Sequence, residues 1–196
     1  MGQNSVMTST GADRAEAMLA AALAAMGDGG EELAATLESL DAPIYVTDAD
    51  GWVTSFNRAC IGFAGRTPVA GQDRWCVTWR LYTEQGDYLP HELCPMAVAI
   101  REARRVRGAV AAAERPDGTR VMFTPYPTPI LDDDGAVIGA VNMLIDVTDK
   151  RQACALDEQA ARCRRLASSL TDARTVATLT GMATEYEAKA GELRHG

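Results

Sequence analysis

The chain has 196 residues, enough for one well-packed domain with helical extensions but not for two full domains. Its net charge of −8 and its pI near 4.8 argue against a nucleic-acid-binding surface. No segment approaches the ~18 consecutive apolar residues of a membrane span. The Ala-rich run 18–26 follows Asp13 and Glu16, not the positive charge of a signal peptide. We therefore expect a cytoplasmic protein without membrane or nucleic-acid partners.

The five cysteines argue against a zinc-binding domain and against a disulfide-stabilised domain. Their number is odd, no Cys-x-x-Cys pair occurs, and neither His91 nor His195 lies at zinc-ligand spacing from paired cysteines. A disulfide framework is not expected in a chain of this length and apolar content. We predict reduced, buried thiols.

The N-terminal part of the chain predicts helices. Residues 1–11 are polar and rich in Gly, Ser and Thr, which predicts disorder. Residues 12–40 consist mainly of helix-forming residues, and Gly and Asp at positions 27–30 interrupt them. This pattern predicts two N-terminal helices.

Short strands are predicted from position 41 onward. Residues 44–48 and 52–56 are β-branched and aromatic, and Asp50-Gly51 between them is a strong hairpin signal. Asn57 is well placed to cap a helix over residues 58–64. The stretch 72–93 gives no clear pattern, and residues 94–106 predict a helix with Pro95 in its first turn.

Three more strands and two helices are predicted to complete the chain. The strands cover residues 109–114, 120–130 and 137–147. Prolines at 125, 127 and 129 remove donors along one edge of the second of these strands, so that edge should lack ladder hydrogen bonds. In residues 149–194, apolar residues recur at three- and four-residue spacing. The predicted stripes are Leu156, Gln159 or Ala160, Cys163, Leu166 and Leu170, then Val176, Leu179, Met182, Tyr186 and Leu193.

Several short motifs, in this order and spacing, resemble the PAS family over residues 32–152. They are Ile44 to Gly51, Phe56-Asn57-Arg58-Ala59, Asp117-Gly118-Thr119, Gly135-x-x-x-Gly139 and Asp146-Val147-Thr148-Asp149. The resemblance implies an α+β fold with a five-stranded antiparallel sheet and helices on one face. It places the PAS core at residues 41–148, between N-terminal helices 12–40 and a C-terminal helical segment 149–194.

The PAS resemblance also implies a cup between sheet and helices that holds a ligand or only side chains. Candidates for the wall of this pocket are Ile61, Trp75, Trp79, His91, Met96, Ile100, Met122 and Met143. On a helix, Trp75 and Trp79 would share a face and form either a lid or part of the core. His91 could ligate a haem iron, with Met96 as a second soft ligand, or could cap a helix or bond a loop carbonyl.

A flavin is not expected. The flavin-binding members of the family carry an Asn-Cys-Arg-Phe-Leu-Gln motif, and the corresponding segment here, residues 73–78, keeps Cys76 but not the polar contacts around it. No enzyme is expected either, because the sequence has no Gly-rich phosphate loop, no His-Glu-x-x-His and no Gly-x-Ser-x-Gly.

These features lead to three hypotheses for the function. The first is a signal-sensing protein that binds a small ligand or a protein partner, with Asp146 and Thr148 coupling the sheet to the exit helix. Its terminal helices would form a homodimer or dock on an effector. The second is a ligand-free dimerisation or interaction module, and the third is a haem-binding gas or redox sensor that uses His91.

Overall fold

The computed structural model describes residues 11–25 and 30–195 of the chain. These residues form two compact units, one ending at Asp146 and one beginning at Val147. The segment predicted to be disordered lies outside the described residues, except Gly11, which begins the first helix. Among the helices that the structure describes, none combines the length and the apolar character that a bilayer crossing requires.

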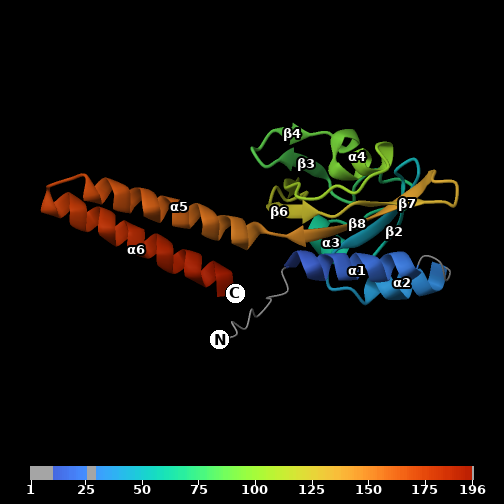
Figure 1. Cartoon of the computed structure of the whole chain (residues 1–196), viewed down its shortest axis with the longest axis horizontal. Helices are drawn as coiled ribbons and strands as arrows, with labels where there is room; N and C mark the ends of the chain where they lie inside the picture. Colours follow the sequence, from blue (N-terminus) through green and yellow to red (C-terminus); the bar gives the residue numbers. More distant parts are fainter. Residues whose placement is uncertain (1–10, 26–29, 196) are drawn as a thin grey trace, which may run out of the picture. The chain divides into compact units, whose positions relative to one another are not determined.

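An antiparallel sheet is the centre of the first unit (Figure 1). Its order is β2-β1-β8-β6-β5-β3-β4, with β7 paired to β8. The strands are β1 (Ile44–Asp48), β2 (Val53–Phe56), β3 (Arg80–Thr83), β4 (Tyr88–Leu89), β5 (Ala111–Glu114), β6 (Arg120–Pro125), β7 (Thr128–Leu131) and β8 (Val137–Asp146). The α+β class and the antiparallel sheet are thus confirmed.

The sheet has eight strands where five were predicted, for two reasons. The stretch without a clear pattern contributes the short β3–β4 hairpin. The predicted strand 120–130 divides at Tyr126 into β6 and β7, and both of these pair with β8. Among the described strands β7 pairs with β8 alone, and on its other edge the Val106 N–H donates to the Pro127 carbonyl. The predicted loss of ladder bonds along the proline edge is therefore confirmed.

Three short helical segments pack on one face of this sheet. They are α3 (Ala59–Ala64), the 3₁₀ turn η1 (His91–Leu93) and α4 (Pro95–Arg101). The last is five residues shorter than predicted at its C-terminal end. The prediction that Asn57 caps α3 is wrong, because the capping position is Arg58. At that helix end it is the Glu38 carboxylate that accepts from the Arg58 N–H, at 3.0 Å.

The buried side chain of Asn57 instead connects the N-terminal helices to β1. Its Oδ1 accepts a hydrogen bond from the Ile44 N–H at 3.1 Å. Its amide donates to the carbonyls of Leu37, Leu40 and Ala42 at 2.9–3.2 Å. One side chain thereby satisfies four backbone groups in the connection into β1.

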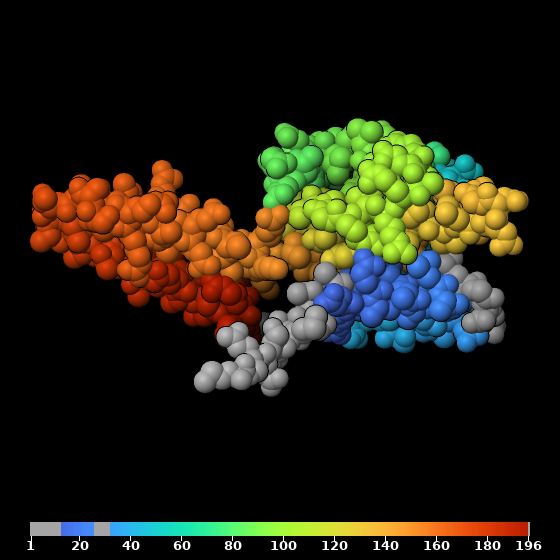
Figure 2. Space-filling view, viewed as in Figure 1, coloured from blue at the N-terminus to red at the C-terminus, as the bar shows by residue number. Residues whose placement is uncertain are grey.

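The opposite face of the sheet is covered by α1 (Gly11–Ala25) and α2 (Gly30–Glu38), so in the first unit both faces carry helices (Figures 1 and 2). Ala15, Leu19 and Leu37 pack there. Alternate residues of a strand point to opposite faces. Ile44 and Met143, which are paired in register, therefore face α1 and α2, whereas Leu144 faces α3 and α4.

The second unit is an antiparallel helical hairpin of α5 (Thr148–Ser168) and α6 (Ala173–His195). The Asp172 carboxylate accepts a hydrogen bond from the Thr175 N–H at 2.8 Å and so caps the start of α6. The predicted apolar stripes need one correction. Leu166, Leu170 and Met182 are 48%, 44% and 39% exposed. Ala167 and Ala183 occupy the buried positions next to Leu166 and Met182, and Leu170 lies past the end of α5.

Candidate functional site

The interior between the sheet and α3 and α4 is filled by the protein's own side chains. Among the predicted pocket residues, Met96 and Ile100 belong to this buried cluster, and Ile61 and Met122 are half-buried. Met143 packs on the other face of the sheet and is no part of this interior. The sequence could not distinguish the two faces, because β8 is apolar on both.

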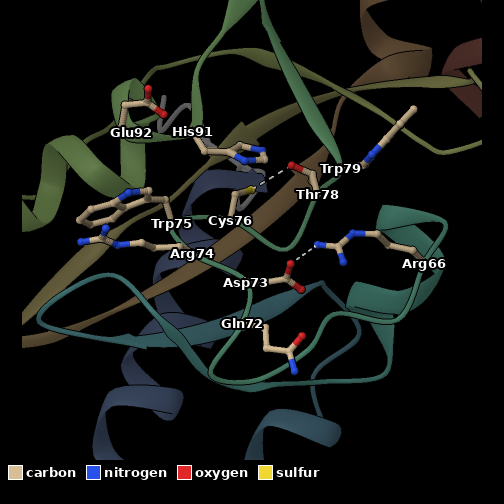
Figure 3. Close-up of a pocket in the computed structure, with 10 residues that line it drawn as sticks. All are labelled: Arg66, Gln72, Asp73, Arg74, Trp75, Cys76, Thr78, Trp79, His91 and Glu92. Carbon is tan, nitrogen blue, oxygen red and sulfur yellow. Dashed lines mark hydrogen bonds and ion pairs between the residues drawn. The ribbon is translucent and has the colours of Figure 1, made fainter.

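An open cleft lies beside this interior, between the loop that follows α3 and the start of η1 (Figure 3). Its volume is ≈ 570 Å³. The structure brings together three of the predicted pocket residues here. The lining comprises Arg66, Gln72, Asp73, Arg74, Trp75, Cys76, Thr78, Trp79, His91 and Glu92. The charged and amide groups of this set were not predicted, because most of them lie in the loop that follows α3, which has no repeating pattern.

Trp75 has an unusual backbone conformation at the wall of the cleft. No helix forms over residues 72–79, so Trp75 and Trp79 do not share a helix face. The φ angle of Trp75 is 67°, in the left-handed region that bulky residues rarely adopt. Its N–H donates to the Gly51 carbonyl at 2.7 Å. The Arg74 guanidinium lies over the rings of both Trp52 and Trp75, at 5.1 and 4.7 Å from their centroids.

Two nitrogen atoms of the cleft residues are buried without a hydrogen-bond partner. They are Nε of Arg66 and Nε2 of His91. Another nitrogen of Arg66 pairs with the Asp73 carboxylate at 2.7 Å. Burial lowers the pKa of His91, and the Arg66 charge lowers it further, against the opposing effect of Glu92 and Asp73. His91 is therefore a neutral imidazole at neutral pH.

A buried polar network connects the cleft to β8. The Tyr45 hydroxyl donates to the Trp75 carbonyl at 2.9 Å and accepts from the Asn142 amide at 3.0 Å. The Asn142 Oδ1 accepts from the Tyr126 N–H at 3.0 Å. Burial raises the pKa of Tyr45 well above its ordinary value, so the hydroxyl remains protonated.

Three free cysteines lie in the interior, and burial suppresses the ionisation of two of them. Cys60, Cys76 and Cys94 are all buried and free. Burial raises the pKa of Cys60 and of Cys94 to about 12, which leaves almost no thiolate at neutral pH. Within the described part of the chain, no group of three or more His, Cys, Asp or Glu side chains could hold a metal ion.

The residues predicted for a haem do not form a haem slot. Met96, the predicted second ligand, is enclosed in the interior cluster, while His91 lines the open cleft. A haem needs an apolar slot around its ligand. The walls next to His91 instead carry Arg66, Asp73 and Glu92.

The comparison with known protein families agrees with this fold. The sequence matches the family model described as the PAS fold over residues 37–152, more than half of the chain. The chain belongs to the PAS fold family. The match covers the predicted PAS core and extends from α2 into α5. No curated protein matches the chain.

Solved structures of PAS and LOV domains are similar to this PAS chain. A PAS domain of a Colwellia psychrerythraea protein is 16% identical, with 60% of this chain and 96% of that chain covered and a TM-score of 0.41. The LOV domain of a blue-light activated histidine kinase from Erythrobacter litoralis is 22% identical, with 56% and 98% covered and a TM-score of 0.44. A Rhodobacter sphaeroides LOV protein is 12% identical, with 84% and 96% covered and a TM-score of 0.45.

Proposed function

We propose that this PAS protein is a non-catalytic cytoplasmic sensor that binds a small carboxylate in the cleft of Figure 3 and relays the signal through β8 to an effector protein. The observation that carries the proposal is the pair of unpartnered nitrogens on Arg66 and His91 in one cleft. A buried polar group without a hydrogen bond costs about 1–3 kcal/mol. A ligand that supplies the missing partner recovers that free energy on binding.

The cleft chemistry favours a flat carboxylate. The Nε–H of Arg66 is a donor, and a charged acceptor makes the stronger hydrogen bond with it. The Trp79 ring is 42% exposed and offers an apolar surface for a flat body. Both nitrogens are shielded from water, so the ligand reaches them after a rotation of the side chains around them.

The intrinsic fluorescence tests this binding, because all three tryptophans are at or beside the cleft. We expect a saturable fluorescence change on titration with benzoate, the simplest flat carboxylate. Arg66→Ala should weaken the apparent affinity at least ~10-fold, since a charge-assisted bond is worth about 1.5–3 kcal/mol. The matched control Arg105→Ala removes an exposed arginine outside the cleft and should leave the affinity unchanged.

Two outcomes of this titration contradict the proposal. One is the lack of any saturable response to benzoate, phenylacetate or cinnamate. The other is equal binding of benzamide and benzoate, which would show that the site does not recognise a carboxylate. The first result favours the ligand-free interaction module, which the filled interior between sheet and helices also supports.

The network of Tyr45 and Asn142 is the proposed relay. Trp75 lines the cleft, and its carbonyl accepts from Tyr45. Tyr45 is paired in register with Asn142 on β8, which ends at Asp146, and α5 begins at Thr148. A ligand that moves Trp75 thereby changes the hydrogen bonds of the strand that leads into the exit helix. The predicted roles of Asp146 and Thr148 remain part of this proposal.

Tyr45→Phe separates binding from relay, because it removes the hydroxyl that makes both bonds. Saturating benzoate should alter the deuterium uptake of residues 148–168 in the unmodified protein. We expect the variant to keep the fluorescence response and to lose this change in uptake. Tyr88→Phe, at a ring that is largely exposed, is the control. An undiminished uptake change in Tyr45→Phe would exclude this network as the relay.

A further inference from the structure

The proposed carboxylate accounts for one of the two unpartnered nitrogens in the cleft. The Nε–H of Arg66 can only donate, and it takes the charged acceptor. The Nε2 of His91 is buried in the same cleft and has no hydrogen-bond partner either (Figure 3). A ligand that carries a carboxylate alone leaves this second nitrogen unpaired, at a cost in affinity. The cleft therefore indicates a second polar group on the ligand.

The polar groups next to these two nitrogens already have partners. The Asp73 carboxylate accepts hydrogen bonds from the Arg66 side chain and from the Val69 N–H, both at 2.7 Å. The Thr78 hydroxyl donates to the Cys76 sulfur at 3.2 Å. Among the described residues that line the cleft, the two nitrogens are therefore the buried side-chain groups that a ligand can still satisfy.

The backbone that carries His91 is held in place by hydrogen bonds on both sides. The His91 carbonyl accepts from the Cys94 N–H at 3.1 Å, where α4 begins. The carbonyl of Glu92 accepts from the Arg101 guanidinium at 2.8 Å. The imidazole is thus attached to a fixed turn, and its rotation, without movement of the backbone, can present Nε2 to a ligand.

The charges around His91 favour an uncharged group at this second position. Burial and the Arg66 charge lower the pKa of His91, so its imidazole is neutral at neutral pH. The carboxylates of Asp73 and Glu92 also act on it. A second carboxylate on the ligand would be repelled by both and would meet no positive charge on the imidazole. A hydroxyl is uncharged, and it pairs with either tautomer of a neutral imidazole because it both donates and accepts.

We propose that the ligand of this cleft is a hydroxylated aromatic monocarboxylate, whose carboxylate binds Arg66 and whose hydroxyl binds the Nε2 of His91. This inference rests on the proposed carboxylate site and names the class of compound that the site selects. The exposed ring of Trp79 lines the same cleft and offers a flat apolar surface to the aromatic body. A site that bonds a ligand hydroxyl discriminates against the analogue without it, because the site's own polar group is then left unpaired.

Isothermal titration calorimetry at neutral pH tests for recognition of the hydroxyl, and it avoids the absorption of hydroxybenzoates where tryptophan is excited. We expect at least one of ortho-, meta- and para-hydroxybenzoate to bind ~5-fold or more tightly than benzoate. Phthalate, which carries two carboxylates on one ring, should bind more weakly than benzoate. Equal affinity for benzoate and all the hydroxybenzoates, or tightest binding of phthalate, would overturn the inference and leave the carboxylate site standing.

Two variants assign the two groups of the ligand to their residues. His91→Phe keeps an aromatic ring without its nitrogens, and it should bind the preferred hydroxybenzoate and benzoate with equal affinity. Arg66→Ala should weaken the binding of both ligands by a similar factor and so preserve their ratio. His195→Gln, at an exposed residue of α6, is the control and should keep both the affinities and the ratio.

The outcomes separate this inference from the proposal on which it rests. If neither benzoate nor any hydroxybenzoate binds, the carboxylate site itself is wrong. If benzoate binds and the hydroxyl adds nothing, only the hydroxyl assignment is wrong. A preference for hydroxybenzoate that persists in His91→Phe would show that another group binds the hydroxyl, which also overturns the assignment. The ligand series on the unmodified protein decides the preference even if a variant fails to fold, which circular dichroism reports.

Discussion

Asn57→Ala is expected to lower the free energy of unfolding of the first unit by about 3–5 kcal/mol, since it leaves several buried backbone groups without partners. The side chain is 1% exposed and makes four hydrogen bonds to the backbone of the connection between α2 and β1. Alanine cannot replace any of them. The buried Ile44 N–H would then have no partner, and the Leu37 carbonyl would keep only the bond from the Leu40 N–H.

Urea denaturation followed by tryptophan fluorescence measures this loss, because all three tryptophans lie in the first unit. Asn57→Asp keeps the acceptor for Ile44 but loses the amide donors, so it should also destabilise strongly. Thr54→Ala, on the neighbouring strand, removes an exposed side chain with one long hydrogen bond and should cost less than about 1 kcal/mol. A loss below about 1 kcal/mol in Asn57→Ala would mean that the network contributes little to stability.

Asn57 also shows where sequence reasoning succeeds and where it fails. Its position after a β-branched strand and before a helix is visible in the sequence and supports the order of the elements. Its hydrogen bonds reach back 13 to 20 residues, to groups whose proximity depends on how α2 packs. A local rule predicts that Asn57 caps a helix. In the folded chain its side chain instead bonds the backbone of the connection between α2 and β1.

Strands were predictable from the sequence where neighbouring turn residues and the residue types along the strand determine them. Asp50-Gly51 favours a tight turn, and the flanking residues are β-branched and aromatic, so the sequence alone predicts β1 and β2. The continuous apolar run of β8 was likewise predictable as a strand. That run is buried on both sides, and for this reason the sequence could not show that Met143 faces α1 and α2 rather than the interior.

The cleft depends on contacts that no local pattern contains. Arg66 pairs with Asp73 within a loop, and the Arg74 guanidinium donates to the Asp50 carbonyl 24 residues earlier. In the sequence, Trp75 is a pocket candidate through its residue type and its four-residue spacing from Trp79. Its left-handed backbone accompanies a hydrogen bond to the hairpin turn against which it packs, and nothing in residues 72–79 alone indicates it.

Gly51→Ala is the second change with a large expected effect, because it introduces a methyl group where the Trp75 indole now lies. Gly51 has a φ of +86°, which alanine adopts at a cost, and its Cβ would overlap the atoms of the indole ring. Gly71→Ala is the matched control, since Gly71 has a similar φ of +74° and open space around it. We expect Gly51→Ala to lose about 1–3 kcal/mol more stability than Gly71→Ala, the usual cost of overpacking.

The difference between these two glycine variants isolates the contact with Trp75 from backbone strain. If the turn holds Trp75 in its left-handed conformation, displacing the indole also releases the Trp75 N–H from the Gly51 carbonyl and alters the carbonyl that Tyr45 bonds. Gly51→Ala should then shift the tryptophan emission and weaken benzoate binding, whereas Gly71→Ala should change neither. Equal stability and equal emission in the two variants would mean that the turn does not position Trp75.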